Sequence, residues 1–276
     1  MNIVSIEQQP IATMVYYRVR KGNRGRERVE WPFYTVYADR LPKGCTALVA
    51  TSDMQGIETV RRKRKWGQLG SRLVGHAVAE YAAELLQERG IDPKQAGILL
   101  AGDLHSDPLL LRRGGHGDVR DVWLAFRDRF KWVVGVAGNH DIFGQDGDLE
   151  RFMALPGMDL LNGSLVEKDD WRIGGVSGVL GTNAAKPWRQ PPELFKSMVQ
   201  TVLQDRPQIM LLHEGPSLLE KELQGRDVIR DYIEACPTSF VICGHRHWPG
   251  NRIETLANGT QVMNVEGKTV LIMLKN

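Results

Sequence analysis

Two short segments rich in metal-binding side chains stand out in this chain. Gly138-Asn139-His140-Asp141 and Gly244-His245-Arg246-His247 each follow an apolar run of strand length. Together they place an amide and three imidazoles at the ends of two buried strands, and such side chains bind divalent metal ions. The two segments therefore predict a metal site, provided that other strands supply carboxylates.

Three further strand-like runs end in polar residues of the same kind. The run at 47–50 leads to Asp53 and Gln55, the run at 98–101 leads to Gly102-Asp103, and the run at 209–212 leads to His213. Because ligand sites in open α/β sheets gather beyond the carboxyl ends of strands, we expect the five ends to meet. The expected metal ligands are Asp53, Gln55, Asp103, Asn139, His213, His245 and His247.

These residue types suit a pair of metal ions. Two divalent ions about 3.5–4 Å apart repel each other, and a carboxylate shared between them offsets that repulsion. Asp103 is the natural candidate for this bridge. Residues at positions i and i+2 of a strand face the same side, so Asp53 can act with Gln55, and His245 with His247.

The order of the five motifs resembles the signature of the calcineurin-like metallophosphoesterase superfamily: Asp-x-His, Gly-Asp, Gly-Asn-His-(Asp/Glu), His and Gly-His-x-His. The resemblance runs from Asp53 to His247 and implies an α/β fold, a four-layer α/β/β/α sandwich with two mixed β-sheets. It also implies two divalent metal ions, and His140 matches the family's catalytic histidine. One ion would take Asp53, Gln55, Asp103 and His247, and the other would take Asp103, Asn139, His213 and His245.

Two departures from the usual motifs refine this expectation. Gln55 stands where the family usually has histidine, and its hard amide oxygen favours Mn or Mg over Zn. We therefore expect manganese, with Fe, Mg or Zn as alternatives. The chain reads Gly-Asp-Leu-His-Ser-Asp at 102–107 and Gly-Asn-His-Asp at 138–141. It thus lacks the Gly-Asp-x-x-Asp-Arg-Gly and Gly-Asn-His-Glu of the Ser/Thr protein phosphatases, and it resembles the phosphodiesterase-type branches instead.

The expected reaction is two-metal-dependent hydrolysis of a phosphate ester, with a phosphodiester as the preferred substrate. A hydroxide bridging the metals would attack phosphorus, Asn139 would stabilise the developing charge, and His140 would protonate the leaving oxygen as general acid. Either Asp141 or Asp107 would orient His140. Further candidates for contacts to the substrate are His105, Arg112, Arg113 and Arg246.

The uneven distribution of charge leaves a second substrate class open. The chain carries a net charge of +3, but residues 1–65 hold 13 Lys/Arg against 6 Asp/Glu. Basic residues at 18–28 and 61–65 could bind an anionic partner, so a metal-dependent nuclease acting on nucleic acid is the alternative. A non-catalytic scaffold on the same fold is less consistent with the sequence, because His140 and nearly all ligand positions are present.

The elements that must position these residues alternate along the chain. An N-terminal β-rich basic extension at 1–44 is expected to pack on a metallophosphoesterase domain at 45–276. In that domain, strand-length apolar runs alternate with amphipathic helices near 73–86, 119–126, 194–203 and 228–233. No apolar stretch approaches the ~20 residues of a membrane span, and the N-terminus lacks signal-peptide features, so no membrane partner is expected. The widely spaced Cys45, Cys236 and Cys243 fit no disulfide framework or zinc site, which favours a reducing cytoplasm.

Overall fold

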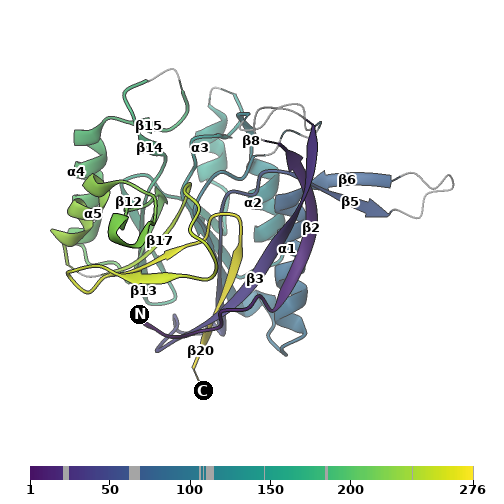
Figure 1. The fold of residues 1–276 in the computed structure, drawn as a ribbon, viewed down its shortest axis with the longest axis horizontal. Coiled ribbons are helices and arrows are strands. Elements are labelled where there is room, and N and C mark those ends of the chain that lie inside the picture. Colours follow the sequence, from purple (N-terminus) through teal and green to yellow (C-terminus); the bar gives the residue numbers. More distant parts are fainter. Residues whose placement is uncertain are drawn as a thin grey trace.

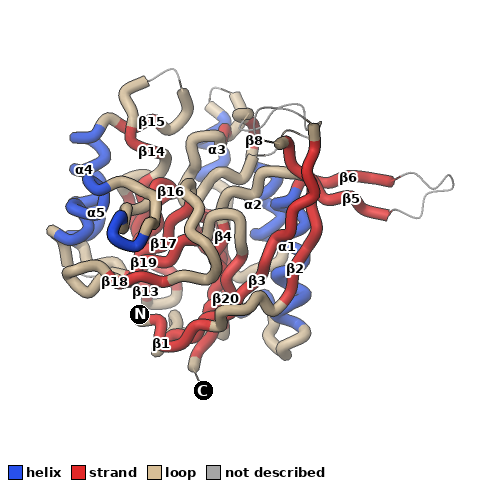
Figure 2. Tube along the Cα trace, viewed as in Figure 1, coloured by secondary structure: helices blue, strands red, loops and turns tan. Residues whose placement is uncertain are grey.

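The computed structural model of this chain contains two β-sheets that face each other, with helices on the outer sides (Figure 1). It describes residues 1–20, 25–61, 69–105, 107, 109, 115–145, 147–183, 186–237 and 239–275. Figure 2 shows the same arrangement by element type, with strands in the middle and helices on the flanks.

The first sheet has ten strands and mixes parallel with antiparallel pairs. Its strand β20 (Thr269–Leu274) pairs antiparallel with β4 (Ala47–Thr51) and parallel with β3 (Arg26–Ala38). Beyond β4 follow β7 (Ala96–Leu100), β9 (Trp132–Gly135) and β11 (Met158–Leu160), all parallel to one another. On the β3 side lie β1 (Ile3–Ile6), β2 (Ala12–Val19), β5 (Ile57–Arg61) and β6 (Leu69–Leu73). The β5–β6 hairpin projects from the body of the molecule (Figure 1).

The second sheet has six strands. In spatial order they are β12 (Ser164–Lys168), β13 (Trp171–Val176), β16 (Ile209–Glu214), β17 (Phe240–Gly244), β19 (Gln261–Asn264) and β18 (Ile253–Thr255). The four inner strands run parallel, and the two edge strands are antiparallel to their neighbours. Two small parallel ladders complete the β structure: β8 (Gly117–Asp118) with β10 (Asp141–Ile142), and β14 (Val179–Leu180) with β15 (Arg189–Gln190).

Three hydrophobic cores separate the layers. Helices α1 (Val74–Gln87) and α2 (Arg120–Arg127) pack on the first sheet, and α4 (Pro192–Gln204) and α5 (Asp227–Glu234) pack on the second. Short helices occur at α3 (Asp148–Met153), η1 (Pro93–Gln95) and η2 (Leu219–Lys221). Within β7, Ile98 and Leu100 belong to the core under α1 and α2, whereas Leu99 belongs to the core between the sheets. This alternation buries both faces of the strand. The predicted four-layer α/β/β/α sandwich with mixed sheets is confirmed.

The N-terminal residues 1–44 contribute strands to the first sheet. β3 lies against β20 along its second half, and the buried Trp31 donates a 2.8 Å hydrogen bond from Nε1 to Thr269 Oγ1. Met14 and Tyr16 of β2 and Trp31 and Phe33 of β3 share a core with α1. The tip of the β5–β6 hairpin, residues 62–68, lies outside the described residues. Within the described part of the chain, no helix has the length and apolar character needed to cross a membrane.

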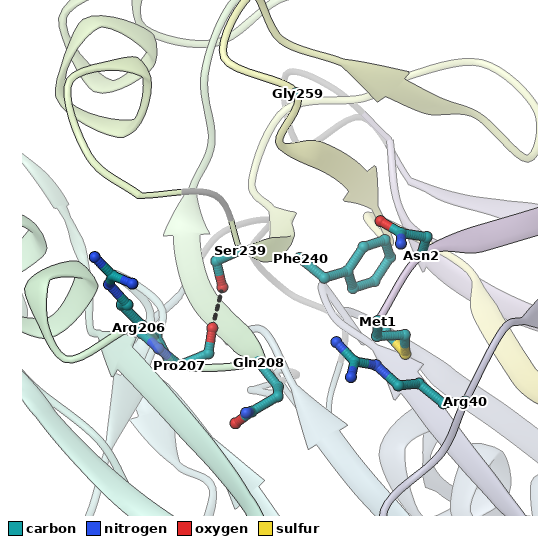
Figure 3. A pocket seen from close by; sticks show the side chains of 9 residues that line it. All are labelled: Met1, Asn2, Arg40, Arg206, Pro207, Gln208, Ser239, Phe240 and Gly259. Carbon is teal, nitrogen blue, oxygen red and sulfur yellow. Dashed lines mark hydrogen bonds between the residues drawn. The ribbon is translucent and has the colours of Figure 1, made fainter.

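A polar pocket lies at the edge where β16 and β17 begin (Figure 3). It is lined by Met1, Asn2, Arg40, Arg206, Pro207, Gln208, Ser239, Phe240 and Gly259. Ser239 Oγ donates a 2.8 Å hydrogen bond to the Pro207 carbonyl there. Because the expected metal ligands follow the other ends of these strands, this pocket is separate from the site described next.

Candidate metal centre

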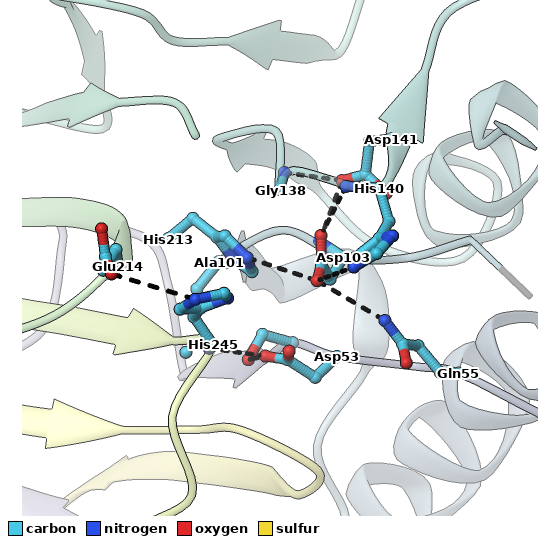
Figure 4. Close-up of polar contacts among 12 residues, drawn as sticks. Asp53, Gln55, Ala101, Asp103, Gly138, His140, Asp141, His213, Glu214 and His245 are labelled. Carbon is cyan, nitrogen blue, oxygen red and sulfur yellow. Dashed lines mark hydrogen bonds and ion pairs between the residues drawn. The ribbon is translucent and has the colours of Figure 1, made fainter. Parts of the chain in front are cut away.

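Carboxyl ends of strands from both sheets meet at one edge of the sandwich, as predicted from the sequence. β4, β7 and β9 are parallel neighbours in one sheet, and β16 and β17 are parallel neighbours in the other. The His213 ring links the two groups, because its Nδ1 lies 2.7 Å from the Ala101 carbonyl oxygen. Polar side chains that follow these strands therefore face a common space (Figure 4).

Asp103 lies in the middle of this space (Figure 4). Asp103, His213 and His245 each offer a ligand atom, and these atoms all lie within 4.8 Å of one another. The Asp103 Oδ2 atom is 3.4 Å from His213 Nε2 and 3.5 Å from the Gln55 amide nitrogen. It is also 3.9 Å from His140 Nε2. A carboxylate with neighbours on several sides is well placed to bridge two ions.

Several buried side-chain atoms in the site have no hydrogen-bond partner among the described residues. The Nδ1 atom of the fully buried His213 faces the Ala101 carbonyl, so in the neutral ring Nδ1 carries the proton and Nε2 keeps a free lone pair. His213 Nε2 and Asn139 Oδ1 are two of these unpartnered atoms, besides His105 Nδ1 and His140 Nδ1, and Asn139 is only 4% exposed. Because buried polar atoms are normally paired, a divalent cation fits this donor set.

The charges in the site support the same conclusion. Burial raises the pKa of Asp53 well above its usual range, and the neighbouring Asp103 adds to the rise. Burial would lower the pKa of His213, but the Asp103 and Asp53 carboxylates outweigh it and raise this pKa to about 10. In the metal-free protein a proton on His213 therefore balances the buried carboxylates, and a metal ion would replace that charge.

Three of the expected ligands have left-handed backbone conformations. The φ angles are 57° at Asp53, 54° at Asp103 and 66° at His245. Residues other than glycine seldom adopt such angles, and the strain that they carry tends to collect at functional sites. The preceding glycines allow close approach: a Cβ on Gly138 would lie 2.0 Å from Asp103 Oδ1, and one on Gly244 would lie 2.5 Å from Asp53 Oδ2. The glycines of the motifs thus let backbone pack directly on the carboxylates.

His247 is the most exposed of the expected ligands, and Gln55 is half-buried. The His247 side chain is 69% exposed, and its Nδ1 lies 2.7 Å from Glu266 Oε2. A carboxylate on one ring nitrogen is common for metal-binding histidines, and here it leaves Nε2 for an ion. Gln55 faces Asp103 with its amide nitrogen, and a half-turn of the amide would present its oxygen. The structure therefore gathers Asp103, His213 and His245 most tightly, with His247 outside that cluster.

His140 lies beside the cluster. Its ring stacks on His116, with centroids 5.0 Å apart and planes at 20°, and its backbone N–H donates to Asp103 Oδ1 at 2.9 Å. Burial lowers the pKa of His140, and the nearby His116 and His213 add to this effect against the opposing influence of Asp103. The ring is thus held next to the expected metal ligands by packing on one side and by a backbone contact on the other.

Asp141 binds backbone rather than the His140 ring. Its fully buried carboxylate accepts hydrogen bonds from four backbone N–H groups, in the loop after β7 and in the loop after β9. The donors are Gly138 at 2.8 Å, Asp103 at 2.9 Å, Leu104 at 2.8 Å and His105 at 3.3 Å. Asp141 therefore joins the loop that carries Asp103 to the loop that carries Asn139, and of the two residues expected to orient His140 it leaves Asp107 as the alternative.

The predicted substrate contacts have different outcomes. The half-buried His105 ring packs on Gly117, where an added Cβ would lie 2.0 Å from His105 Cε1. Burial lowers the pKa of His105, with Asp107 opposing and His140 adding to the shift, so His105 belongs to the same region as His140. Arg246 is exposed on the loop next to His245. Arg112 and Arg113 lie outside the described residues.

Two acidic residues that the sequence analysis did not single out support the site. Glu214 is fully buried at the end of β16, and its Oε1 lies 3.9 Å from His245 Nε2. The sequence feature that could have identified Glu214 is its position directly after His213, as a carboxylate at the end of an apolar strand. Glu266, which contacts His247, had no such signal, because that contact depends on how distant loops meet.

Comparisons with known proteins agree with this arrangement. The model of the family described as calcineurin-like phosphoesterase matches residues 47–249. Among solved structures, the chain is similar to TT1561 of Thermus thermophilus, at 17% identity over 80% of this chain and 88% of that chain, with a TM-score of 0.54. It also matches a novel archaeal phosphodiesterase, at 13% identity over 79% of this chain and 82% of that chain, with a TM-score of 0.36. The search of curated proteins found no match. The chain belongs to the calcineurin-like phosphoesterase family.

Proposed function

We propose that this chain is a two-metal-dependent hydrolase of phosphate esters that prefers phosphodiesters. The observation that carries the proposal is the cluster of Asp103, His213 and His245, with His140 3.9 Å from the Asp103 carboxylate. The family match supports phosphate-ester hydrolysis as the reaction class. The preference for diesters rests on the motif variants at 102–107 and 138–141, which differ from those of protein phosphatases.

The metal ligands follow from the motifs and from the unpartnered acceptors. One ion would be held by Asp53, Gln55, Asp103 and His247, and the other by Asp103, Asn139, His213 and His245. Manganese suits this set best, with Fe, Mg and Zn as alternatives, because the Gln55 amide adds a hard oxygen. When bound, the two ions would act as Lewis acids on the phosphoryl group and supply a nucleophile at neutral pH.

The chain's own residues would complete the reaction. His140 would donate a proton to the leaving oxygen, because its ring lies beside Asp103 at the edge of the metal cluster. An anionic phosphate in the site would favour the protonated imidazole and so supply this proton. Asn139 would place its amide near the phosphoryl oxygens. Asp141 would keep the loops that carry Asp103 and Asn139 in register.

A metal-resolved assay tests this function. Metal-free protein would be reloaded with Mn, Mg, Zn or Fe and assayed on bis(p-nitrophenyl) phosphate, p-nitrophenyl phosphate and single-stranded DNA. We expect the fastest turnover of the diester with Mn, and its loss in a chelator. Absence of phosphate-ester hydrolysis with every metal, or hydrolysis that persists in a chelator, would contradict the proposal.

A comparison of substrates with different leaving groups tests separately whether His140 is the general acid. A general acid matters for a basic alkoxide and little for a p-nitrophenolate, which leaves without a proton. His140→Asn should therefore lower turnover of a dinucleotide by about 10²–10⁴-fold. It should affect thymidine 5′-(p-nitrophenyl phosphate) far less, with bound Mn unchanged. Equal losses on both substrates would show that His140 is not the proton donor.

Nucleic acid is the alternative substrate. In the described part of the basic cluster at 18–28, Arg18 is paired with Glu27 at 2.6 Å, and Arg28 lies 3.8 Å from Glu30. These contacts reduce the positive field of the cluster at 18–28. In the second basic cluster, at 61–65, residues 62–65 lie outside the described part of the chain. DNA hydrolysis that falls steeply with salt would favour the nuclease.

The cellular location is also a proposal. The structure contains free thiols at Cys45, Cys236 and Cys243, and two of them are buried. Unpaired cysteines support a reducing compartment such as the cytoplasm.

A further inference from the structure

A buried carboxylate next to the proposed metal ligands holds an arginine that the reaction above does not use. Glu214 is fully buried, and its Oε2 accepts a 2.8 Å hydrogen bond from the Leu180 backbone N–H. Its Oε1 lies 3.9 Å from His245 Nε2 and accepts a 2.7 Å hydrogen bond from Arg226 Nε. Figure 4 shows Glu214 on the side of His245 away from Asp103. Glu214 therefore connects the Arg226 guanidinium to the edge of the metal centre.

The backbone of Arg226 is fixed as well as its side chain. Its N–H donates to the Gly215 carbonyl at 3.1 Å, and its carbonyl accepts from Ile229 and Arg230 in the first turn of α5, each at 3.2 Å. Gly225 lets the chain turn back closely here, since a Cβ there would lie 2.1 Å from the Pro216 carbonyl oxygen. An arginine held at both ends loses little freedom when it binds a ligand.

The far edge of the guanidinium is open. The Arg226 side chain is 44% exposed, and among the described residues only its Nε has a partner. Arginine–carboxylate pairs are frequently bidentate, but here the second oxygen of Glu214 accepts from the Leu180 N–H. Within the described part of the chain, the single Nε contact therefore leaves both Nη groups without a partner. Arg246, next to His245 in the sequence, is exposed on the other loop and carries a second positive charge.

We propose that Arg226, together with Arg246, forms an anion subsite that binds a second negatively charged group of the substrate, a phosphate or a carboxylate close to the scissile phosphate. Glu214 Oε1 lies 2.7 Å from Arg226 Nε and 3.9 Å from His245 Nε2, so these two nitrogens are no farther apart than the sum of the two distances. One small molecule can therefore reach both. This inference rests on the proposed function, because it assigns the substrate class of the same site.

Matched ligands that differ by one phosphate test the subsite. Calorimetry on Mn-loaded protein would compare thymidine 3′,5′-bisphosphate with thymidine 5′-monophosphate. We expect the bisphosphate to bind about 10- to 100-fold more tightly, the range of a charged hydrogen bond. In parallel, thymidine 5′-(p-nitrophenyl phosphate) would be hydrolysed with and without a 3′-phosphate, and we expect the added phosphate to lower KM with little change in kcat. A further arm with phosphoglycolate and ethyl phosphate would tell a carboxylate from a phosphate.

Variants assign the preference to Arg226. Arg226→Gln should bring the two affinities within about twofold. Arg226→Gln alone leaves the buried Glu214 carboxylate without its cationic partner, which can destabilise the fold. The double variant Glu214→Gln/Arg226→Gln removes both charges and is therefore the variant expected to fold. Arg230→Gln is the matched control: Arg230 lies in the first turn of α5, four residues after Arg226, but pairs loosely with Asp227 at 3.6 Å, and its loss should leave the preference intact.

Each result decides the question. Loss of the bisphosphate preference in the Arg226 variants, but not in Arg230→Gln, supports the subsite. A wild-type protein that binds the bisphosphate no more tightly than the monophosphate, and phosphoglycolate no more tightly than ethyl phosphate, overturns it. So does a double variant that keeps the preference or weakens both ligands equally, because Arg226 would then be structural or would contact the scissile phosphate. Binding does not require turnover, so failure of hydrolysis would count against the proposed function alone.

Discussion

Replacement of Asp141 by asparagine tests whether one buried carboxylate supports the metal centre through its backbone contacts. Asp141 accepts four N–H groups, two on each oxygen: Leu104 and His105 on Oδ1, and Gly138 and Asp103 on Oδ2. The asparagine side chain has nearly the same shape but only one acceptor oxygen. Whichever way the amide turns, its NH2 group faces two buried donors instead of accepting from them.

The cost of this change follows from the number of donors that lose their acceptor. A buried donor left without a partner costs about 1–3 kcal/mol, so two donors give a loss of about 2–6 kcal/mol in the free energy of unfolding. Domains are commonly stable by about 5–15 kcal/mol, so the loss is a large share of the total. At about 2–4 °C per kcal/mol for a chain of comparable size, Tm should fall by at least about 4 °C.

The measurement is urea and thermal unfolding of metal-free protein in a chelator, so that bound metal does not mask the change. Asp121→Asn is the matched control, because Asp121 is exposed on α2, and we expect a change within about 0.5 kcal/mol. Asp141→Asn should also weaken metal binding, since the backbone that positions Asp103 loses an anchor. A stability loss below about 1 kcal/mol would refute the argument, because it would mean that the four hydrogen bonds contribute little.

Two further predictions concern metal binding itself. The pKa of His213 is raised to about 10 by the buried carboxylates, so the stability from its proton is complete below the unfolded pKa and is lost as the pH rises toward 10. Metal binding at pH 7 should therefore release about one proton from His213, seen by calorimetry in buffers of different ionisation enthalpy, and His213→Gln should remove that proton. If Glu266 orients His247 for a metal, Glu266→Gln should weaken one of two bound Mn ions by about 10- to 100-fold and leave the other unchanged, as measured by equilibrium dialysis. If the Mn stoichiometry and both affinities are unchanged, Glu266 has no part in metal binding.

The sequence predicted the centre of the site because parallel strands end at a shared edge. Asp103 and His245 follow directly after strand-length apolar runs, and His213 lies near the end of one. In an α/β sandwich this is enough to bring them together without knowledge of side-chain contacts. The structure gathers these three residues within 4.8 Å. The same reasoning placed β4, β7, β9, β16 and β17, whose apolar runs are nearly continuous because both faces are buried.

The supporting contacts could not be predicted in this way. Whether Asp141 faces the His140 ring or the backbone depends on how two loops pack, so the sequence left Asp141 and Asp107 as alternatives for orienting that ring. The contact between Glu266 and His247 joins different loops, so no local pattern encodes it. Charge counting had a similar limit: Arg18 is paired with Glu27 directly across the β2–β3 ladder, which a count of basic residues at 18–28 does not show.

The difference in burial across the site bears on where the Gln55 substitution has its effect. Asp103, Asn139 and His213 are each at most 4% exposed, whereas the His247 side chain is 69% exposed. Gln55, the residue that departs from the family pattern, would bind the same ion as His247. An amide is a weaker ligand than an imidazole for Zn but is acceptable to Mn and Mg. On the proposed ligand sets, the departure would therefore fall on the ion whose ligands are less enclosed. There it would change which metal binds and how readily that metal exchanges, without disturbing the buried cluster of Asp103, Asn139 and His213.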